Sequence, residues 1–284
     1  MRHKILIPTD FSKNATKALW YALELYKNDY CNFYLLNAFT AKSNTIEDLM
    51  SMEPKTKLYE SRKLESENGL AKVYDMIATS DYINPKHHFN VISVFNTPIK
   101  AIKDLVEKRD IEMIVMGTKG ETYSNATVFS STAIYVMEKV RNCPIIVVPQ
   151  NAKSAMPKEI VFPTSYKTHY KRRELYYLID ITEKSEATII ILHISKETEL
   201  SKDQKENKQL LEEILEDTNH KSHFLSHNWI ETAINIFVDS RDSDMVAFIN
   251  KKHAFFGSIL TNPLVKNISF QSKVPILVMH DLRN

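Results

Sequence analysis

Glycine is scarce in this chain. Only 4 of its 284 residues are glycine, namely Gly69, Gly117, Gly120 and Gly257, whereas soluble proteins use about 7%. A Rossmann fingerprint and a P-loop each need several glycines at fixed spacing, and these four form neither pattern. The sequence therefore excludes the two commonest glycine-rich nucleotide sites.

Cysteine, net charge and long apolar runs are also limited. Cys31 and Cys143 are too few for a zinc cluster, and we expect both to be buried in a reduced, cytoplasmic protein. The 37 basic and 35 acidic residues give a net charge of +2, without the basic excess of a nucleic-acid-binding protein. No stretch approaches the roughly 18 apolar residues of a membrane span, and the N-terminus does not resemble a secretion signal. We expect neither nucleic acid nor membrane as a partner.

The remaining composition is that of an ordinary globular protein. Hydrophobic residues make up 43% of the chain and charged residues 25%, which provides for a packed core. At roughly 100–200 residues per domain, 284 residues predict two domains.

The two halves of the sequence resemble each other. Three segments of the first half match three of the second in the same order: 5–10 with 160–165, 101–113 with 233–245, and 143–148 with 274–279. Ordered matches of this kind indicate a duplicated unit. We therefore predict domains at 1–150 and 158–284, with a linker at 151–157.

Each copy alternates short apolar runs with longer segments of helical periodicity. In the first copy strands are expected near 3–8, 32–39, 87–94, 112–116 and 144–148, and helices near 12–28, 55–79, 98–109 and 128–141. In the second copy strands are expected near 158–163, 187–194, 220–226, 244–248 and 275–279, and helices near 168–184, 201–218, 230–241 and 260–271. This alternation predicts two α/β units, each a doubly wound parallel sheet with helices on both faces.

Ligands of open parallel sheets lie beyond the carboxyl ends of the strands. Asp10 follows the first strand, where it either contacts a ligand or, with Ser12, simply forms the turn that begins the next helix. Gly117 and Gly120 follow the fourth strand, where glycine allows positive φ and close approach of a ligand. Three hydroxyl residues then begin a helix whose N-terminus is suited to an anion: Ser130, Ser131 and Thr132.

These positions resemble those of the universal stress protein family. Its ATP-binding members carry an acidic residue after strand one and the motif G-x2-G-x9-G-[S/T] after strand four. This chain has Asp10 and Gly117-x2-Gly120-x9-Ser130-Ser131, with serine in place of the third glycine. The resemblance covers both copies and implies five-stranded parallel sheets of order 3-2-1-4-5. Because family members pair through their last strands, it also implies an intrachain pseudo-dimer joined by 145–148 and 276–279, and it leaves a homodimer of the whole chain open.

The resemblance also implies roles for individual residues. Asp10 would face the nucleoside, and the backbone of Ala38 would hydrogen-bond adenine. The phosphates of ATP, with Mg²⁺, would lie against Gly117, Gly120, Ser130 and Ser131. Neighbouring residues that would complete the site are Pro8, Thr9, Met116, Lys119 and Thr132. The second copy has no such site, because Ser165 stands for Asp10, and Ile249 and Lys252 stand for the two glycines.

The sequence shows no set of residues for strong catalysis. His220 and His223 lie on opposite faces of an expected strand, so a shared metal is not predicted. We expect a stress-response protein with one degenerate ATP site in the first domain and a structural or interaction role for the second. Any ATPase or autophosphorylation activity would be slow. The alternative is a scaffold without nucleotide that binds a protein partner or a small apolar ligand.

Overall fold

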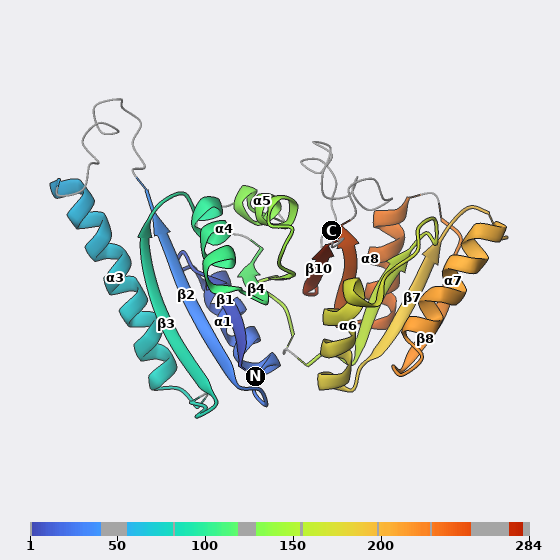
Figure 1. The fold of residues 1–284 in the computed structure, drawn as a ribbon, viewed down its shortest axis with the longest axis horizontal. Helices are drawn as coiled ribbons and strands as arrows, with labels where there is room; N and C mark the ends of the chain where they lie inside the picture. The colour runs from blue at the N-terminus through green and yellow to red at the C-terminus, as the bar shows by residue number, and fades with distance from the viewer. Residues whose placement is uncertain are drawn as a thin grey trace.

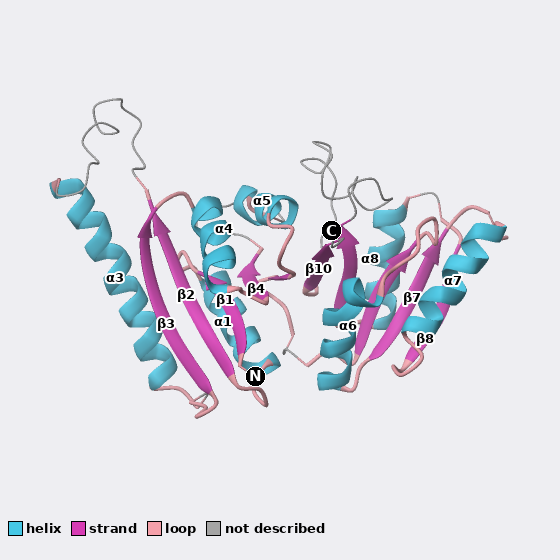
Figure 2. Cartoon of the chain, in the orientation of Figure 1, coloured by secondary structure: helices cyan, strands magenta, loops and turns pink. Residues whose placement is uncertain are grey.

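The fold was taken from a computed structural model of the chain. It describes residues 2–40, 56–81, 83–118, 129–153, 156–197, 199–227, 229–250 and 273–280. The strands of both halves form one sheet, with helices on its two faces (Figure 1, Figure 2). Among the described helices, none is long and apolar enough to cross a membrane.

The described residues of the first half contain five parallel strands. They are β1 (His3–Pro8), β2 (Cys31–Phe39), β3 (His87–Phe95), β4 (Met113–Gly117) and β5 (Ile145–Val148). Its described helices are α1 (Lys13–Leu25), α3 (Lys57–Ala78), α4 (Pro98–Arg109) and α5 (Ser131–Lys139). The strand order is β3-β2-β1-β4-β5, as predicted.

The second half has the same strand order. Its strands are β6 (Glu159–Thr164), β7 (Thr188–Ile194), β8 (His220–Leu225), β9 (Met245–Asn250) and β10 (Ile276–His280). Its described helices are α6 (Arg172–Ser185), α7 (Lys202–Ile214) and α8 (Ile230–Arg241). The order β8-β7-β6-β9-β10 repeats that of the first half, again with parallel pairing.

The two halves meet at β5 and β10, which pair antiparallel. Ile146 lies opposite Leu277, and both are completely buried. Pairing of these two apolar strands satisfies the backbone groups that each would otherwise expose at an edge. The predicted seam between 145–148 and 276–279 is confirmed, and the result is one sheet of ten strands.

The core has two layers, one on each face of the sheet. On one face, Leu19 of α1 and Leu178 of α6 pack in one cluster, together with residues of α3 and α7. On the other face, Ile102 of α4 and Ile234 of α8 pack in a second cluster, together with residues of α5. Successive strand residues supply opposite layers, as the two-residue period of a strand requires. The chain is thus doubly wound, as its alternating sequence predicts.

Polar contacts also join the halves. Lys184 of α6 lies 3.1 Å from Asp29, which follows α1, and 2.8 Å from Asp180 one turn earlier in α6. On the other face Arg141 donates to the carbonyl of Asn250 at 2.8 Å. These contacts flank the β5–β10 seam and fix the two halves against each other.

Element boundaries differ from expectation at a few ends. The helix expected near 168–184 begins only at Arg172, where Lys171 is the N-cap and its amide donates to the Glu174 carboxylate at 3.1 Å. The helix expected near 128–141 begins at Ser131, after its cap Ser130. The helix expected near 260–271 falls outside the described residues.

Candidate functional site

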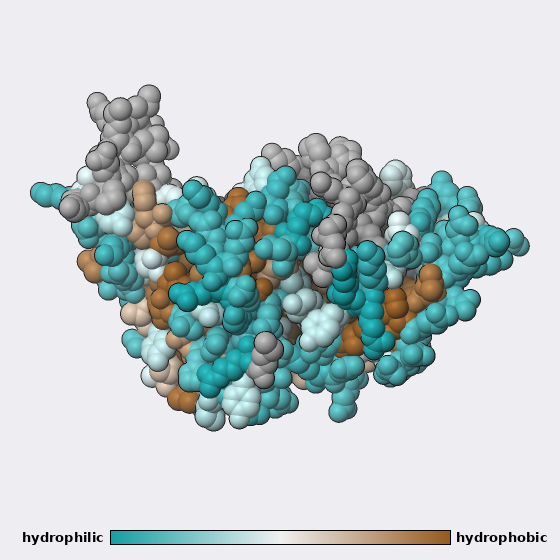
Figure 3. Space-filling view, in the orientation of Figure 1, coloured by the Kyte–Doolittle hydropathy of each residue, from teal (hydrophilic) through white to brown (hydrophobic). Residues whose placement is uncertain are grey.

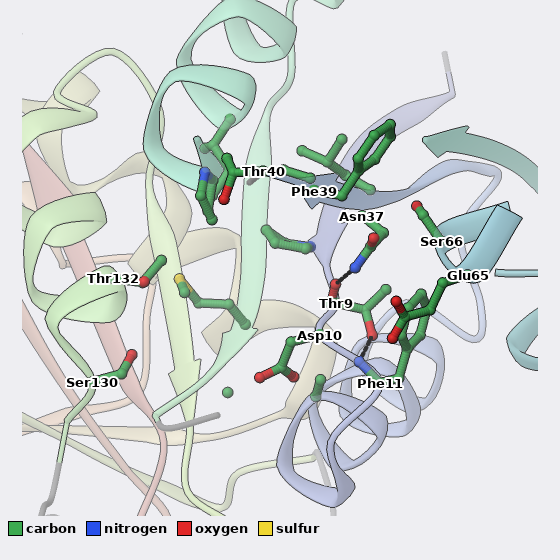
Figure 4. A pocket seen from close by; sticks show the side chains of 18 of the residues that line it. Thr9, Asp10, Phe11, Asn37, Phe39, Thr40, Glu65, Ser66, Ser130 and Thr132 are labelled. Atoms are coloured by element: carbon green, nitrogen blue, oxygen red, sulfur yellow. Dashed lines mark hydrogen bonds between the residues drawn. The ribbon is translucent and has the colours of Figure 1, made fainter. Parts of the chain in front are cut away.

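A cavity of about 540 Å³ opens at the carboxyl ends of β1, β2 and β4 (Figure 4). Helices α3, α4 and α5 complete its walls. Eight of the residues predicted from the sequence line it: Pro8, Thr9, Asp10, Ala38, Met116, Gly117, Ser130 and Thr132. The topology therefore brings the end of the first strand and the end of the fourth strand to one place, because β1 and β4 are neighbours in the sheet.

Asp10 both forms the turn after β1 and lines the cavity. The Oδ1 atom of Asp10 accepts a hydrogen bond from the amide of Ser12 at 3.1 Å, and Ser12 Oγ caps α1 by accepting from Ala15 at 3.1 Å. This is the turn-forming role that the sequence left open. Asp10 is nevertheless exposed and lines the cavity, so its carboxylate is also placed to accept from a ligand (Figure 4).

Phe11 adopts a left-handed backbone conformation, with φ of 65°. Its amide donates to Thr9 Oγ1 at 3.0 Å, which stabilises this unusual conformation for a large residue. The turn directs the ring towards α3, where a β-carbon on Gly69 would overlap it. Gly69 is therefore needed for packing against Phe11, which forms one wall of the cavity.

Gly117 does not have the positive φ that glycine would allow. None of the described glycines has positive φ, so Gly117 is not required for a left-handed turn. A β-carbon at this position would instead lie 2.8 Å from Cγ and Oδ1 of Asn14 in α1. Close packing of β4 against α1 thus explains this glycine, although its backbone still faces the cavity.

Ser130 occupies the place of the third motif glycine without strain. Its φ is −68°, and its Oγ accepts from the amide of Ala133 at 3.1 Å as the cap of α5. The side chain is 5% exposed and is engaged with its own helix. Thr132 also lines the cavity, whereas Ser131 is exposed and is not among the lining residues. Lys119 and Gly120 lie outside the described residues.

Several lining residues were not predicted from the sequence. Asn37, at the end of β2, donates from Nδ2 to the carbonyl of Thr9 at 2.7 Å and so ties the ends of β1 and β2 together. A polar residue at the end of an apolar strand could have suggested it. Three others come from α3: Arg62, Glu65 and Ser66. The sequence gives no signal for these three, because they lie in a helix rich in polar residues.

The charges of the cavity are unevenly placed. Glu65 and Ser66 project from α3 at one end, while Ser130 and Thr132 lie at the other, with Asp10 between them (Figure 4). Arg62 is the only cation among the described lining residues, and it pairs with Glu65 at 2.8 Å. At the α5 end of the cavity, an anion would therefore be attracted by backbone amides and hydroxyl groups at the N-terminus of the helix.

The corresponding turn in the second half is occupied by the protein itself. Tyr166 has φ of 54° and its amide donates to Thr164 Oγ1 at 3.1 Å, as in the first half. Its ring is 2% exposed and lies 5.0 Å from the ring of His193. Helix α7 closes the turn further, because Gln204 and Asn207 donate to the carbonyls of Ser165 and Tyr166, each at 2.8 Å.

Comparisons with known proteins agree with this fold and with the first half in particular. Residues 1–149 match the model of the universal stress protein family. A universal stress protein of Methanocaldococcus jannaschii is 27% identical over 150 residues, which cover 53% of this chain and 84% of that protein.

Two solved structures are similar over both halves. The crystal structure of a universal stress protein from Archaeoglobus fulgidus matches with a TM-score of 0.67 and 16% identity, covering 97% of this chain and 95% of that one. A structure described as a putative universal stress protein from Pseudomonas aeruginosa matches with a TM-score of 0.60 and 10% identity, covering 98% and 93%. At these identities the likeness concerns the fold alone. The family match over 1–149, together with this shared fold, shows that the chain belongs to the universal stress protein family.

Proposed function

We propose that the first half binds one adenine nucleotide, ATP with Mg²⁺, in the cavity at the ends of β1, β2 and β4, and that the protein acts in a stress response. The observation that carries the proposal is the convergence of Asp10, Ala38 and Gly117 on one cavity. Its volume of about 540 Å³ lies within the roughly 300–1,000 Å³ of small-molecule sites. The family to which the chain belongs includes nucleotide-binding members.

The lining fits the parts of a nucleotide. Leu36, Ile102 and Met116 supply apolar walls for a base, and the backbone of Ala38 is placed to hydrogen-bond its edge. Asp10 is a ready acceptor for ribose hydroxyls. The N-terminus of α5 offers amides and the hydroxyl of Thr132 to phosphates. Mg²⁺ would accompany the phosphates of ATP, and we assign no side chain of the described lining to it.

Ser130 is compatible with this proposal. A serine side chain in place of the family glycine could crowd a phosphate, but that of Ser130 is turned into the cap of α5, and its backbone is unstrained. Replacement of the family glycine therefore leaves the helix N-terminus in place. The Ser130 amide donates to the Thr118 carbonyl at 2.6 Å, so in this proposal Ser130 holds the N-terminus of α5 in place and Ser131 contributes a backbone amide. Gly120, outside the described residues, keeps its expected role.

We assign a structural or interaction role to the second half. Its turn after β6 lacks the acidic residue and is filled by Tyr166 and closed by α7. We further propose that the halves are domains, 1–150 and 158–284, joined by a linker at 151–157. Cys31 and Cys143 are both free and buried, which fits a reducing compartment such as the cytoplasm.

Calorimetric titration with ATP and MgCl₂ tests the proposal. Wild-type protein should bind one nucleotide per chain. Asp10→Asn should bind at least about tenfold more weakly, because the amide keeps an oxygen for Ser12 but loses the charge that favours hydroxyl donors. Asp110→Asn is the matched control, since it removes a carboxylate from the left-handed C-cap of α4 without touching the cavity lining.

The second candidate is a scaffold that binds a small apolar ligand or a protein partner. The apolar walls Leu36, Ile102 and Met116 favour it. In that case wild-type protein gives no heat with millimolar ATP, and an environment-sensitive apolar dye binds in the cavity instead. Enzyme activity is not proposed, because the described lining contains no nucleophile paired with a base.

A further inference from the structure

Among the described residues, the ten-stranded sheet ends in one unpaired strand on each side, and the two end strands differ. The last strands of the two halves, β5 and β10, already pair with each other within one chain, so neither is an edge strand. The outer strands are therefore β3 at one end and β8 at the other. An outer strand offers unpaired backbone donors and acceptors to another strand.

The two edge strands are protected to different degrees. Strand β8 has six residues and carries Lys221, and both shortness and a lysine discourage pairing at an edge. Strand β3 has nine residues, with the sequence HHFNVISVF. It contains no lysine, arginine, carboxylate or proline, so the features that usually prevent edge-to-edge association are missing from it.

Half of the backbone groups of β3 point away from β2. Cys31 at the start of β2 donates to the carbonyl of Lys86 at 3.0 Å, and Asn96 donates to the carbonyl of Phe39 at 3.1 Å. In a parallel ladder the residues of one strand bond alternately to its two sides. Even-numbered residues of β3 therefore face β2, and the amides and carbonyls of Phe89, Val91 and Ser93 face outward.

The side chains along this edge are also poorly covered. Val91 is 46% exposed and Phe95 39% exposed, although both lie on the face of β3 against which α3 packs. Tyr74 of α3 is 46% exposed beside Phe89, with ring centroids 6.4 Å apart. Figure 3 shows hydrophobic side chains gathered between α3 and α4. On the other face of β3, Ile92 and Val94 are half-buried.

We propose that β3 pairs antiparallel with β3 of a second copy of this chain, about a twofold axis at Val91. The pairing would join two ten-stranded sheets in the way that β5 and β10 join the two halves. A second copy fits because β3 carries no lysine, arginine or carboxylate that would repel its own counterpart across a twofold axis. Val91 would lie opposite its own copy, Phe89 opposite Ser93, and Asn90 opposite Ile92, so no like charges meet.

His87, at the start of β3, adds no positive charge to the strand when its imidazole is neutral. It is 8% exposed, and burial lowers the pKa of its imidazole although the bond to the carbonyl of Tyr26 opposes this. In the twofold arrangement it lies opposite Phe95, an apolar side chain. The pairing of β3 does not depend on nucleotide binding, because no described residue of β3 lines the candidate cavity.

Analytical ultracentrifugation of the full chain tests the pairing. Wild-type protein should sediment as a dimer at sub-millimolar concentration. Val91→Pro removes only an outward-facing amide, which an edge strand tolerates, and should yield a monomer. Phe224→Pro in β8 is the matched control. Because Ser195 donates to the Leu225 carbonyl, the backbone groups of Leu225 face β7 and those of the preceding residue, Phe224, face outward. The Phe224→Pro protein should therefore remain a dimer.

A second variant distinguishes loss of strand pairing from misfolding of the Val91→Pro protein. Val91→Lys places two like charges opposite each other across the axis and should also give a monomer, with a far-ultraviolet circular dichroism spectrum equal to that of wild type. The proposal is overturned if the wild-type chain is monomeric throughout this range. It is overturned equally if a folded Val91→Lys protein stays dimeric.

Discussion

Gly117 at the end of β4 and Asn14 in the first turn of α1 occupy adjoining space. A β-carbon on Gly117 would lie 2.8 Å from the Asn14 side chain. Asn14 donates from Nδ2 to the carbonyl of Val148 at 2.9 Å and accepts from Thr118 Oγ1 at 3.1 Å. One buried side chain therefore holds α1, β4 and β5 together directly beneath the candidate cavity.

Gly117→Ala should destabilise the protein by roughly 1–3 kcal/mol, because the added methyl group overpacks the contact with Asn14. Chemical denaturation measures this directly. In an Asn14→Ala background the same substitution should cost clearly less, since the crowded side chain is gone. Equal penalties in both backgrounds would show that Gly117 is needed for a different reason. Loss of nucleotide binding in a Gly117 variant is therefore not by itself a test of the ligand site.

Gly69 and Phe11 form a second pair of this kind. Gly69→Ala should destabilise wild-type protein, because its methyl group overlaps the ring of Phe11. In a Phe11→Ala background the sign should reverse, with a gain of up to about 1 kcal/mol from better helix propensity in α3. Denaturation of the four proteins of this double-mutant cycle gives the result. A gain for Gly69→Ala in wild type would contradict the packing described here.

Lys184 should be important for the contact between the halves. Burial alone would lower the pKa of its ammonium group, but hydrogen bonds and attraction to Asp180 and Asp29 outweigh it and raise the pKa. Lys184→Met keeps the length of the side chain but leaves two partly buried carboxylates without a cation. We expect a loss of about 1–3 kcal/mol at pH 7.

Urea denaturation at pH 7 measures this loss. Lys208→Met is the control, because its pair with Glu212 is more exposed and lies within one helix. It should cost at most about 0.5 kcal/mol. Similar losses for both variants would mean that Lys184 does not join the halves.

His87 should make the stability depend on pH. Burial lowers the pKa of its imidazole in the folded protein, partly opposed by donation to the carbonyl of Tyr26 at 3.0 Å. Below about pH 6.5 the unfolded chain binds the proton first, so the free energy of unfolding falls as the pH decreases. His87→Gln should reduce this fall, whereas His88→Gln, at an exposed neighbour, should leave it unchanged. Identical pH profiles for the two variants would contradict the assignment.

Much of the fold could be predicted because its signals are local. Short apolar runs such as 144–148 are too brief for helices, and their alternation with periodic segments predicts parallel strands. The repeated matches between the halves then predict the same order twice. The ends of β1 and β4 were placed at one site because that strand order makes them neighbours.

The remainder depends on contacts that the sequence does not display. Arg62, Glu65 and Ser66 line the cavity only because α3 packs on β2 and β3, and Ser66 is held there by Ser93 at 2.8 Å. The reason for Gly117 lies in Asn14, about a hundred residues away in the chain. Likewise, the helical capping role of Ser130 is not distinguishable from a phosphate contact by residue type alone.

We propose one adenine nucleotide in the first half of the chain and none at the corresponding place in the second half. A crystal structure of the chain grown with ATP and MgCl₂ decides this. We expect nucleotide density in the cavity, with the sugar beside Asp10 and the phosphates at the N-terminus of α5, and no nucleotide at the turn around Ser165. A cavity without nucleotide at saturating ATP, or nucleotide bound at Ser165 instead, would contradict it.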